Sequence, residues 1–343
     1  TEFNRDISHK WELNTNYKGV RRPYFTEIRE ETMPSGLAAY IAGDVPGYGV
    51  GPTTPPAELQ IIEANPVLKS EMAEGIATGT DYIGFNTTGK FAPLDNPDVR
   101  LALCKAIDKD TLVQEIFRGY SYTGWGLIPT GFPNNQDDAI KTLDPNVYDP
   151  EKARELLAAA GFPDGKDFPT FEMYIRQPSD TDLALCEAMQ ARWKENLNIT
   201  VELRPSDFQS FTSSLKENAP IYYVNYNMDY LDPATFMNVW RSSGRHPHTD
   251  TSWDEFYTAA NSILNDPAKR FEQLREAEKR LIEGTAWFFM KHNFGIGLSP
   301  CNLKGEWATP NKNGFVFKGG PPGVPNAREG VYWAEASCRA GVA

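Results

Sequence analysis

Residues 170–203 read TFEMYIRQPSDTDLALCEAMQARWKENLNITVEL, in which two short runs flank a longer amphipathic one. The pattern predicts a strand over 170–175, a long helix over 180–197 and a second strand over 199–203. A strand–helix–strand crossover of this kind is parallel and right-handed in nearly all folds. The segment therefore predicts an α/β domain.

Regular elements continue on both sides of this segment. Before it, cap residues and apolar spacing predict three helices: one begins at Pro97, one extends over 112–117 and one begins at Pro150. After it, the sequence predicts a helix over 206–217 with serine at its N-cap, a strand over 221–226, helices over 251–264 and 266–284, and a strand from Ala286. Residues 96–292 are therefore predicted to form one α/β domain.

The two ends of the chain are less regular. Residues 1–95 predict strands over 25–31 and 80–85, a helix over 35–43 with serine at its N-cap, and a helix from Pro55-Pro56 to Ala64. The Gly/Pro-rich tail ends in a predicted strand over 330–333. We expect residues 1–95 and 293–343 to be two parts of one further domain, with crossings near 86–95 and 293–302.

The composition argues against several classes of protein. The 343 residues include 34 Lys and Arg against 46 Asp and Glu, for a net charge of −12, which disfavours a nucleic-acid partner. No window reaches the roughly 18 apolar residues of a membrane helix, and no apolar leader is visible at the start. A zinc site is not expected, because none of the four cysteines forms a CxxC pair. Separate buried thiols are favoured, and a Cys301–Cys338 disulfide stays open.

A polar and aromatic stretch, VNYNMDYLDP at 224–233, follows the predicted strand over 221–226. Open α/β sheets bind ligands in loops at the carboxyl ends of their strands, and this stretch occupies such a place. Asp232-Pro233 is typical of a helix start, so we interpret Asp232 as structural. Asp229 has no such structural role and is the candidate partner for a positive group of a ligand. The alternative is that Asp229 is a residue of a solvent-exposed turn. The other candidate wall residues are Tyr226, Tyr230, Asn225 and Asn227.

Motifs for other chemistries are weak. His246-Pro247-His248 offers two imidazoles, but an HxH loop in a chain with 4 histidines predicts surface histidines rather than a metal site. A hydrolase nucleophile elbow is missing, and GYGVGPTTPP lacks the lysine of a phosphate loop. The rival enzyme class is a glycosidase that pairs Asp229 with a second acid about 5–10 Å away. We expect no enzymatic activity.

Several segments occur in a specific order. They are YIGFNTT (82–88), NPDVRLALCKAIDKDTLVQEIFRG (96–119), GLIPTGFP (126–133), YDPEKARELLAAAGFPDG (148–165), AMQARWKENLNITVELR (188–204), MDYLDPATF (228–236) and DPAKRFEQLREAEKRLIE (266–283). Each alone is a weak signal, but together they resemble the extracellular solute-binding proteins of family five, the dipeptide- and oligopeptide-binding receptors of ABC importers. The likeness spans residues 82–283.

The resemblance implies the type II periplasmic-binding-protein fold, an α/β fold with a mixed sheet flanked by helices. Two such lobes are joined by hinge strands, with the ligand buried between them. Residues 15–45 resemble the segment that comes after most of the first lobe in the family. We therefore expect residues 1–95 to be the C-terminal part of the first lobe, 96–292 the second lobe, and 293–343 the hinge return and final strands of the first.

The resemblance also implies roles for the residues around Asp229. In peptide-binding members the Asp of an A-D-Y motif pairs with the α-ammonium of the peptide, and that Asp falls on Asp229. A Trp that stacks on the ligand falls on Tyr226, and the backbone of Asn225 and Asn227 pairs with an extended peptide as an added strand. The remaining expected contacts are Phe208 and Tyr230, which line the pocket, and Tyr82 and Asn86, which stand near the first hinge.

Two departures from the family pattern affect the ligand. Met228 replaces Ala and Tyr226 replaces Trp, so pocket volume and stacking differ. Where oligopeptide-binding members carry Arg near the end of the predicted 206–217 helix, this chain has Leu215 and Lys216, which leaves carboxylate recognition there open. Nickel, haem, opine and oligosaccharide binders also occur in the family, so the ligand is not fixed.

We therefore predict the C-terminal part of the substrate-binding component of an ABC importer, which captures extracellular peptides or related small solutes between two lobes. An oligosaccharide-binding member of the family is the alternative. The expected partners are the solute and the ABC permease subunits, without nucleic acid, and the protein is expected to be a monomer. Its expected location is periplasmic or extracellular, with a lipid anchor left open. The resemblance implies no cofactor or metal.

Overall fold

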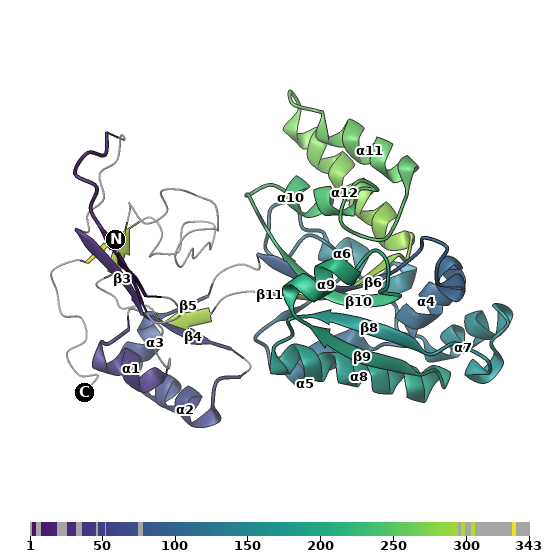
Figure 1. Ribbon diagram of the computed structural model, residues 1–343, viewed down its shortest axis with the longest axis horizontal. Coiled ribbons are helices and arrows are strands. Elements are labelled where there is room, and N and C mark those ends of the chain that lie inside the picture. The colour runs from purple at the N-terminus through teal and green to yellow at the C-terminus, as the bar shows by residue number, and fades with distance from the viewer. Residues whose placement is uncertain are drawn as a thin grey trace. The chain divides into compact units, whose positions relative to one another are not determined.

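The computed structural model describes residues 2–4, 8–18, 26–31, 36–45, 47–51, 53–74, 78–293, 296–298, 303–305 and 331–333. The chain divides into a smaller unit, residues 1–76 with 295–343, and a larger unit, residues 77–294 (Figure 1). Cys301 and Cys338 lie outside the described residues, whereas Cys104 and Cys186 are buried free thiols of the larger unit.

The larger unit is built on a six-stranded mixed sheet (Figure 1). Its order is β7 (Tyr122–Thr123), β11 (Trp287–Asn293), β6 (Gly79–Phe85), β10 (Ile221–Asn227), β8 (Phe171–Arg176) and β9 (Val201–Ser206). β8 is parallel to both β9 and β10, whereas β6 is antiparallel to β10 and β11. The predicted α/β class and the parallel strand–helix–strand unit at 170–203 are confirmed.

Helices cover both faces of this sheet (Figure 1). One face carries α5 (Lys109–Phe117), α7 (Pro150–Ala159) and α8 (Asp180–Leu197), and α4 (Pro97–Lys105) packs on α7. The other carries α10 (Ala234–Met237), α11 (Thr251–Asn261) and α12 (Pro267–Glu283). The shorter elements are α6 (Asp137–Ile140), α9 (Phe208–Ser214) and the 3-10 helices η1 (Ala92–Asp95), η2 (Asp144–Asn146), η3 (Pro163–Gly165) and η4 (Asn238–Trp240).

Local sequence explains where α8 begins and ends. Ser179 and Asp182 form a reciprocal capping box at its start, and Asn198 ends it in the left-handed region with φ of 54°. On its inner face Trp193 is fully buried and donates Nε1–H to the Leu103 carbonyl at 2.9 Å. Burial of one large apolar side chain contributes about 1.5–3 kcal/mol, so this face holds the helix on the sheet.

Two predicted caps differ in the structure. The helix predicted over 206–217 is α9, and its cap is Asp207, whose Oδ1 accepts from the N–H groups of Gln209 and Ser210. Ser206 is not available as a cap because it is the last residue of β9, in register with Arg176. The helix predicted over 35–43 is α1 (Leu37–Ala42), which has Gly36 at its N-cap; Ser35 lies outside the described residues.

The division of the chain also differs from the predicted boundaries at 95/96 and 292/293. It falls at 76/77 and 294/295, so the predicted strand over 80–85 belongs to the larger unit as β6. All seven residues of β6 are buried, and the strand is paired on both sides. A strand buried on both faces belongs at the centre of a sheet, which explains this placement. The assignment of the smaller unit to a first lobe stays a prediction.

The described part of the smaller unit contains short strands and three helices. One sheet has the order β1 (Glu2–Asn4), β2 (Ser8–Glu12) and β3 (Glu27–Glu31), and a second has the order β4 (Tyr48–Val50), β12 (Ile296–Leu298) and β5 (Met72–Glu74). The other elements are α1, α2 (Pro56–Ala64), α3 (Pro66–Glu71), β13 (Leu303–Gly305) and β14 (Val331–Trp333). Because β12 pairs between β4 and β5, the chain returns to this unit after β11.

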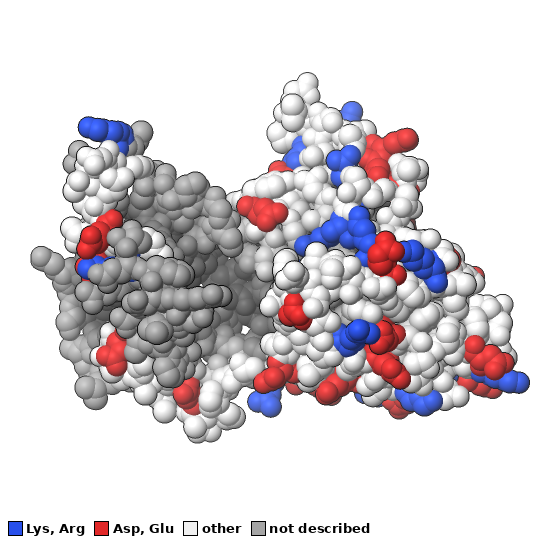
Figure 2. Space-filling view, viewed as in Figure 1, with Lys and Arg blue, Asp and Glu red and all other residues white. Residues whose placement is uncertain are grey.

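The described surface is mixed in charge. On the face of the larger unit seen in Figure 2, Lys and Arg side chains lie among Asp and Glu. Several form exposed pairs, such as Arg192 with Glu195 and Arg204 with Glu172; exposed pairs contribute about 1 kcal/mol or less. None of the helices in the described ranges is long and apolar enough to cross a membrane.

Candidate ligand-binding site

The carboxyl end of β10 is the centre of the candidate site. β10 pairs with β6 from Ile221 to Asn227 but with β8 only as far as Tyr223. Arg176 of β8 donates Nη2–H to the Asn225 carbonyl at 2.9 Å and also contacts the Asn225 side chain. Alternate residues of a strand direct their backbone groups to alternate edges, so Asn225 and Asn227 present theirs on the β8 side. Beyond Tyr223, no described strand pairs with that edge.

Asp229 follows this strand and is exposed. The Tyr226 hydroxyl donates to its Oδ2 at 2.6 Å, and the Asp229 N–H donates to Thr235 Oγ1 at 3.0 Å. Burial and the hydrogen bond to Asp229 raise the pKa of Tyr226 to about 12, so the phenol stays a donor. Among the described residues, no Lys, Arg or His nitrogen lies within 4.0 Å of the Asp229 carboxylate. The carboxylate is therefore oriented and exposed, and it lacks a cationic partner in the described part of the chain.

Asp232 has a structural role, as expected, although the helix starts one residue later. α10 begins at Ala234, whose N–H donates to Asp232 Oδ1 at 2.9 Å. Arg270 at the start of α12 donates to both carboxylate oxygens of Asp232, at 2.9 and 2.7 Å. This bidentate pair joins the loop after β10 to α12, and such pairs are among the stronger charge-assisted contacts.

Two predicted wall residues expose aromatic rings. Phe208 is 53% exposed and lies with its ring centroid 5.8 Å from the Arg176 guanidinium. Tyr230 is 46% exposed, and its hydroxyl accepts from Asn238 Nδ2 at 3.0 Å. Exposed aromatic faces at the end of a strand suit contact with a ligand.

A cavity of about 200 Å³ lies beside Tyr226 and Phe208. Its lining comes from α9, from β10 and from two segments far apart in the chain: Arg176, Phe208, Phe211, Thr212, Leu215, Lys216, Val224, Arg245 and His246. The guanidinium of Arg245 lies 5.1 Å from the centroid of the Tyr226 ring. Arg176 and Arg245 were not predicted from the sequence, because only the tertiary structure brings residues this far apart in the chain to one cavity.

Two other predicted contacts are core residues. Tyr82 is fully buried, with its hydroxyl 3.1 Å from His246 Nε2 and its ring centroid 4.4 Å from that of Trp240. Asn86 is also fully buried, and its Nδ2 donates to the Ala219 carbonyl at 3.1 Å. Neither side chain reaches the surface of the larger unit, so contact of Tyr82 and Asn86 with a ligand stays a prediction.

The expected surface position is wrong for His246. It is 2% exposed and stacks against Trp240, with ring centroids 4.5 Å apart. Burial and the nearby Arg245 charge hold the pKa of His246 well below its usual range, so the ring is neutral. His248 Nδ1 lies 2.7 Å from Thr87 Oγ1. Within the described ranges, no group of three or more His, Cys, Asp or Glu residues could hold a metal ion.

A buried ion network lies near the same end of the sheet. Lys291 Nζ lies 2.8 Å from Asp81 Oδ2 and 3.1 Å from Asp182 Oδ1, and the Tyr223 hydroxyl donates to Asp81 Oδ2 at 2.9 Å. Burial alone would lower the pKa of Lys291, but the two carboxylates outweigh it and raise that pKa. Burial raises the pKa of Asp81 against the opposing charge of Lys291. Charged residues inside apolar strands are the sequence signal for this network, which was not predicted.

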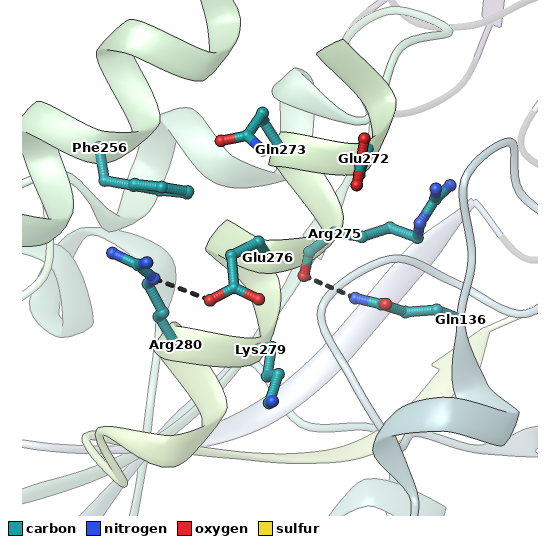
Figure 3. Close-up of a pocket in the computed structure, with 8 residues that line it drawn as sticks. All are labelled: Gln136, Phe256, Glu272, Gln273, Arg275, Glu276, Lys279 and Arg280. Carbon is teal, nitrogen blue, oxygen red and sulfur yellow. Dashed lines mark hydrogen bonds and ion pairs between the residues drawn. The ribbon is translucent and has the colours of Figure 1, made fainter. Parts of the chain in front are cut away.

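A larger hollow of about 370 Å³ lies along α12 (Figure 3). It is lined by Gln136, Phe256, Glu272, Gln273, Arg275, Glu276, Lys279 and Arg280. Arg280 donates to Glu276 at 3.0 Å and stacks over Phe256 at 3.9 Å, and Gln136 donates to the Arg275 carbonyl at 2.8 Å. These contacts hold the lining groups against one another, so the smaller cavity beside Tyr226 is the better ligand site.

The chain is similar in sequence to known solute-binding proteins. Oligopeptide-binding protein OppA of Bacillus subtilis is 28% identical over 232 residues, which are 64% of this chain and 42% of that protein. Glutathione-binding protein GsiB of Salmonella typhimurium is 26% identical over 247 residues, 69% of this chain and 46% of that protein. The chain thus spans less than half the length of these curated relatives, which are named as solute-binding proteins rather than enzymes.

A solved structure shows the same fold. DppA from Helicobacter pylori, in complex with the peptide STSA, is 18% identical and matches with a TM-score of 0.73 over 98% of this chain and 62% of that one. This agreement confirms the predicted type II periplasmic-binding-protein fold. The family model described as bacterial extracellular solute-binding proteins, family 5 (middle region), matches residues 1–247. The chain therefore belongs to the bacterial extracellular solute-binding proteins of family 5.

Proposed function

We propose that this chain binds extracellular peptides with a free α-ammonium, as part of the substrate-binding component of an ABC importer. The observation that carries the proposal is the Asp229 carboxylate, which is exposed, held by the Tyr226 hydroxyl at 2.6 Å and without a cation within 4.0 Å among the described residues. The resemblance to the family supports this role, because the ammonium-binding Asp of its peptide-binding members falls on Asp229. A charge-assisted hydrogen bond there is worth about 1.5–3 kcal/mol.

The edge of β10 supports a peptide rather than an isolated amine. The backbone groups of Asn225 and Asn227 lie on the side where β8 has ended at Arg176. An extended peptide can add there as a strand, with its ammonium directed to Asp229. Main-chain pairing of this kind tolerates many side chains, because every peptide offers the same backbone.

The remaining parts of the proposal follow from the same role. Binding and release require no bond to be made or broken, so no catalysis is included. Bound peptide would be passed to ABC permease subunits, and the protein would act as a monomer at a periplasmic or extracellular location. Lipid anchoring is compatible with this role and is not required by it.

The exposed rings of Phe208 and Tyr230 favour a second candidate, an oligosaccharide. Sugars stack on aromatic faces, and Asp229 would then accept hydroxyl groups instead of an ammonium. The two candidates differ in what removal of the charge costs, because an ammonium loses its ion pair with Asp229, whereas a neutral sugar hydroxyl can still donate to an amide oxygen.

Calorimetric titration tests the proposal with the protein expressed from its complete gene. Tetra-alanine is compared with N-acetyl-tetra-alanine and with cello- and xylo-oligosaccharides. The free-amine peptide should bind, and Asp229→Asn, which keeps the acceptor for Tyr226, should weaken it about 10- to 100-fold. Asp138→Asn is the matched control, since that side chain is fully exposed on α6.

Equal affinity of the wild type and Asp229→Asn for the free-amine peptide would contradict the ammonium role. Heat with the oligosaccharides alone would replace the peptide proposal with the sugar candidate.

A further inference from the structure

The cavity beside Tyr226 carries positive groups that the proposed ammonium site does not use. Arg176, Lys216 and Arg245 all line it. Lys216 donates to the Gly244 carbonyl at 2.8 Å, and Arg176 donates to the Asn225 carbonyl. Within the described part of the chain, none of the three lies within 4.0 Å of a carboxylate oxygen. The cavity therefore holds an excess of positive charge.

Arg245 is the least satisfied of these cations. Its Nε and Nη2 atoms are buried and have no hydrogen-bond partner. Burial and the like charge of the neighbouring Arg245 lower the pKa of Arg176. Buried donors of a cation are costly to leave unpaired, because each loses its water without a replacement. An anion in the cavity would satisfy them.

His246 has one ring nitrogen without a partner. Its Nε2 lies 3.1 Å from the Tyr82 hydroxyl, and its Nδ1 is buried without a hydrogen-bond partner. In the neutral tautomer that carries its proton on Nδ1, this nitrogen is a further donor for an anion. Arg245 and His246 are adjacent in the chain and both line the cavity.

Apart from Thr212, the remaining walls are apolar, which limits the form of the anion. Phe211, Leu215 and Val224 are each at most 4% exposed, and Phe208 covers one side. Apolar walls around buried donors suit a carboxylate at the end of a hydrocarbon stem. A free inorganic anion would lose its hydration against these walls without the gain of apolar contact.

We propose that this cavity is a subsite for the acidic side chain of a bound peptide, with its carboxylate on Arg245 and His246 and its methylene groups against Phe211 and Leu215. The inference rests on the proposed peptide-binding function and adds a side-chain preference to it. Arg245 packs on the ring of Tyr226, whose hydroxyl holds Asp229. The subsite therefore serves a residue close to the amino end of the peptide. Glu is favoured over Asp, because the longer hydrocarbon stem of Glu makes more contact with the apolar walls.

Paired peptides test this subsite without any substitution in the protein. Glu and Gln are placed in turn at each position of tetra-alanine, and each pair is titrated into the protein expressed from its complete gene. At the first or second position the Glu peptide should bind about 10- to 100-fold more tightly than the Gln peptide. The corresponding Asp peptide should fall between them.

Two variants assign the preference to Arg245. Arg245→Gln should remove the Glu-over-Gln ratio, and Arg245→Lys should keep part of it, with melting temperatures checked to show that both variants fold. Arg192→Gln is the control for loss of charge, because Arg192 pairs with Glu195 on the exposed face of α8. This control should leave the ratio unchanged.

The outcomes separate this subsite from the proposed function. If no peptide binds, both fall. If tetra-alanine binds but Glu and Gln peptides bind equally at every position, water satisfies the donors and only the subsite is refuted. If amidation of the peptide C-terminus abolishes binding and Arg245→Gln removes that effect, the cavity holds the main-chain carboxylate and the side-chain assignment is wrong.

Discussion

Replacement of Lys291 by methionine is expected to destabilise the larger unit strongly. The ammonium lies 2.8 Å from Asp81 and 3.1 Å from Asp182, and the side chains of Lys291 and Asp81 are 5% and 3% exposed. Removal of one partner of a buried ion pair costs about 3–5 kcal/mol, because the remaining charge stays buried. Here two carboxylates would face each other, so the upper part of that range is expected at neutral pH.

The effect should depend on pH in a defined direction. In the wild type, burial disfavours the charged form of Asp182, but Lys291 and Ser179 outweigh burial and lower the pKa of Asp182. The stability that ionised Asp182 contributes is therefore present above about pH 4 and is lost as pH falls. In Lys291→Met the paired carboxylates should have pKa values raised above the unfolded values. Stability of the variant should then fall as pH rises through the acid range. The difference from the wild type should therefore be larger at pH 7.5 than at pH 4.5, by up to about 1.4 kcal/mol per unit of carboxylate pKa shift.

Urea denaturation at the two pH values, with hydrogen exchange of β6, β11 and α8 to localise the loss, measures this effect. Asp81→Asn in the Lys291→Met background should restore part of the stability, since it removes the orphaned charge. Lys152→Met is the control, because Lys152 is 51% exposed and pairs with Glu155 on the surface of α7. A loss below about 1 kcal/mol, or an equal loss at both pH values, would refute the reasoning.

Two further predictions concern α9 and α12. Asp207→Ala removes the cap of α9, a helix of seven residues, and should cost about 0.5–2 kcal/mol of stability. The loss should appear as faster hydrogen exchange of the Gln209 and Ser210 amides, whereas Asp207→Ser should keep most of their protection. Burial raises the pKa of Glu278 to about 7, above its unfolded value, so wild-type stability should decline on the order of 3 kcal/mol between about pH 4.5 and 7. Glu278→Gln should abolish that decline in denaturation curves, and an unchanged slope would exclude this carboxyl as its source.

Much of the larger unit was predictable from local sequence. Asn96, Asp149 and Asp266 cap helices because their side chains accept the free N–H groups of the first turn, and each cap lies next to its helix in the chain. The strand–helix–strand unit at 170–203 was likewise predictable, since the crossover geometry allows a parallel arrangement almost without exception. Ser206 was assigned as a cap because local sequence does not show that pairing with β8 extends β9 through that residue.

The candidate site was predictable only in part. Asp229 and Tyr226 lie three residues apart and form a direct hydrogen bond, so one stretch of sequence contains both. Tyr82 and Asp81 are adjacent in β6 and point to opposite faces of the sheet. Because all of β6 is buried, its sequence lacks the apolar–polar alternation that would distinguish a core face from a ligand-facing one. Tyr82 was predicted as a ligand contact, whereas both Tyr82 and Asp81 are buried in the larger unit.

Local sequence was sufficient for the helices, most of their caps, the α/β class and the resemblance to family 5, because each rests on residues close together or on ordered local motifs. It was not sufficient for the contacts between distant residues, such as Arg245 with Tyr226 at the cavity and Lys291 with Asp81 in the buried ion network. These contacts follow from the order of strands in the sheet. That order depends on the packing of the whole unit, and a local pattern of apolar and polar residues does not contain it.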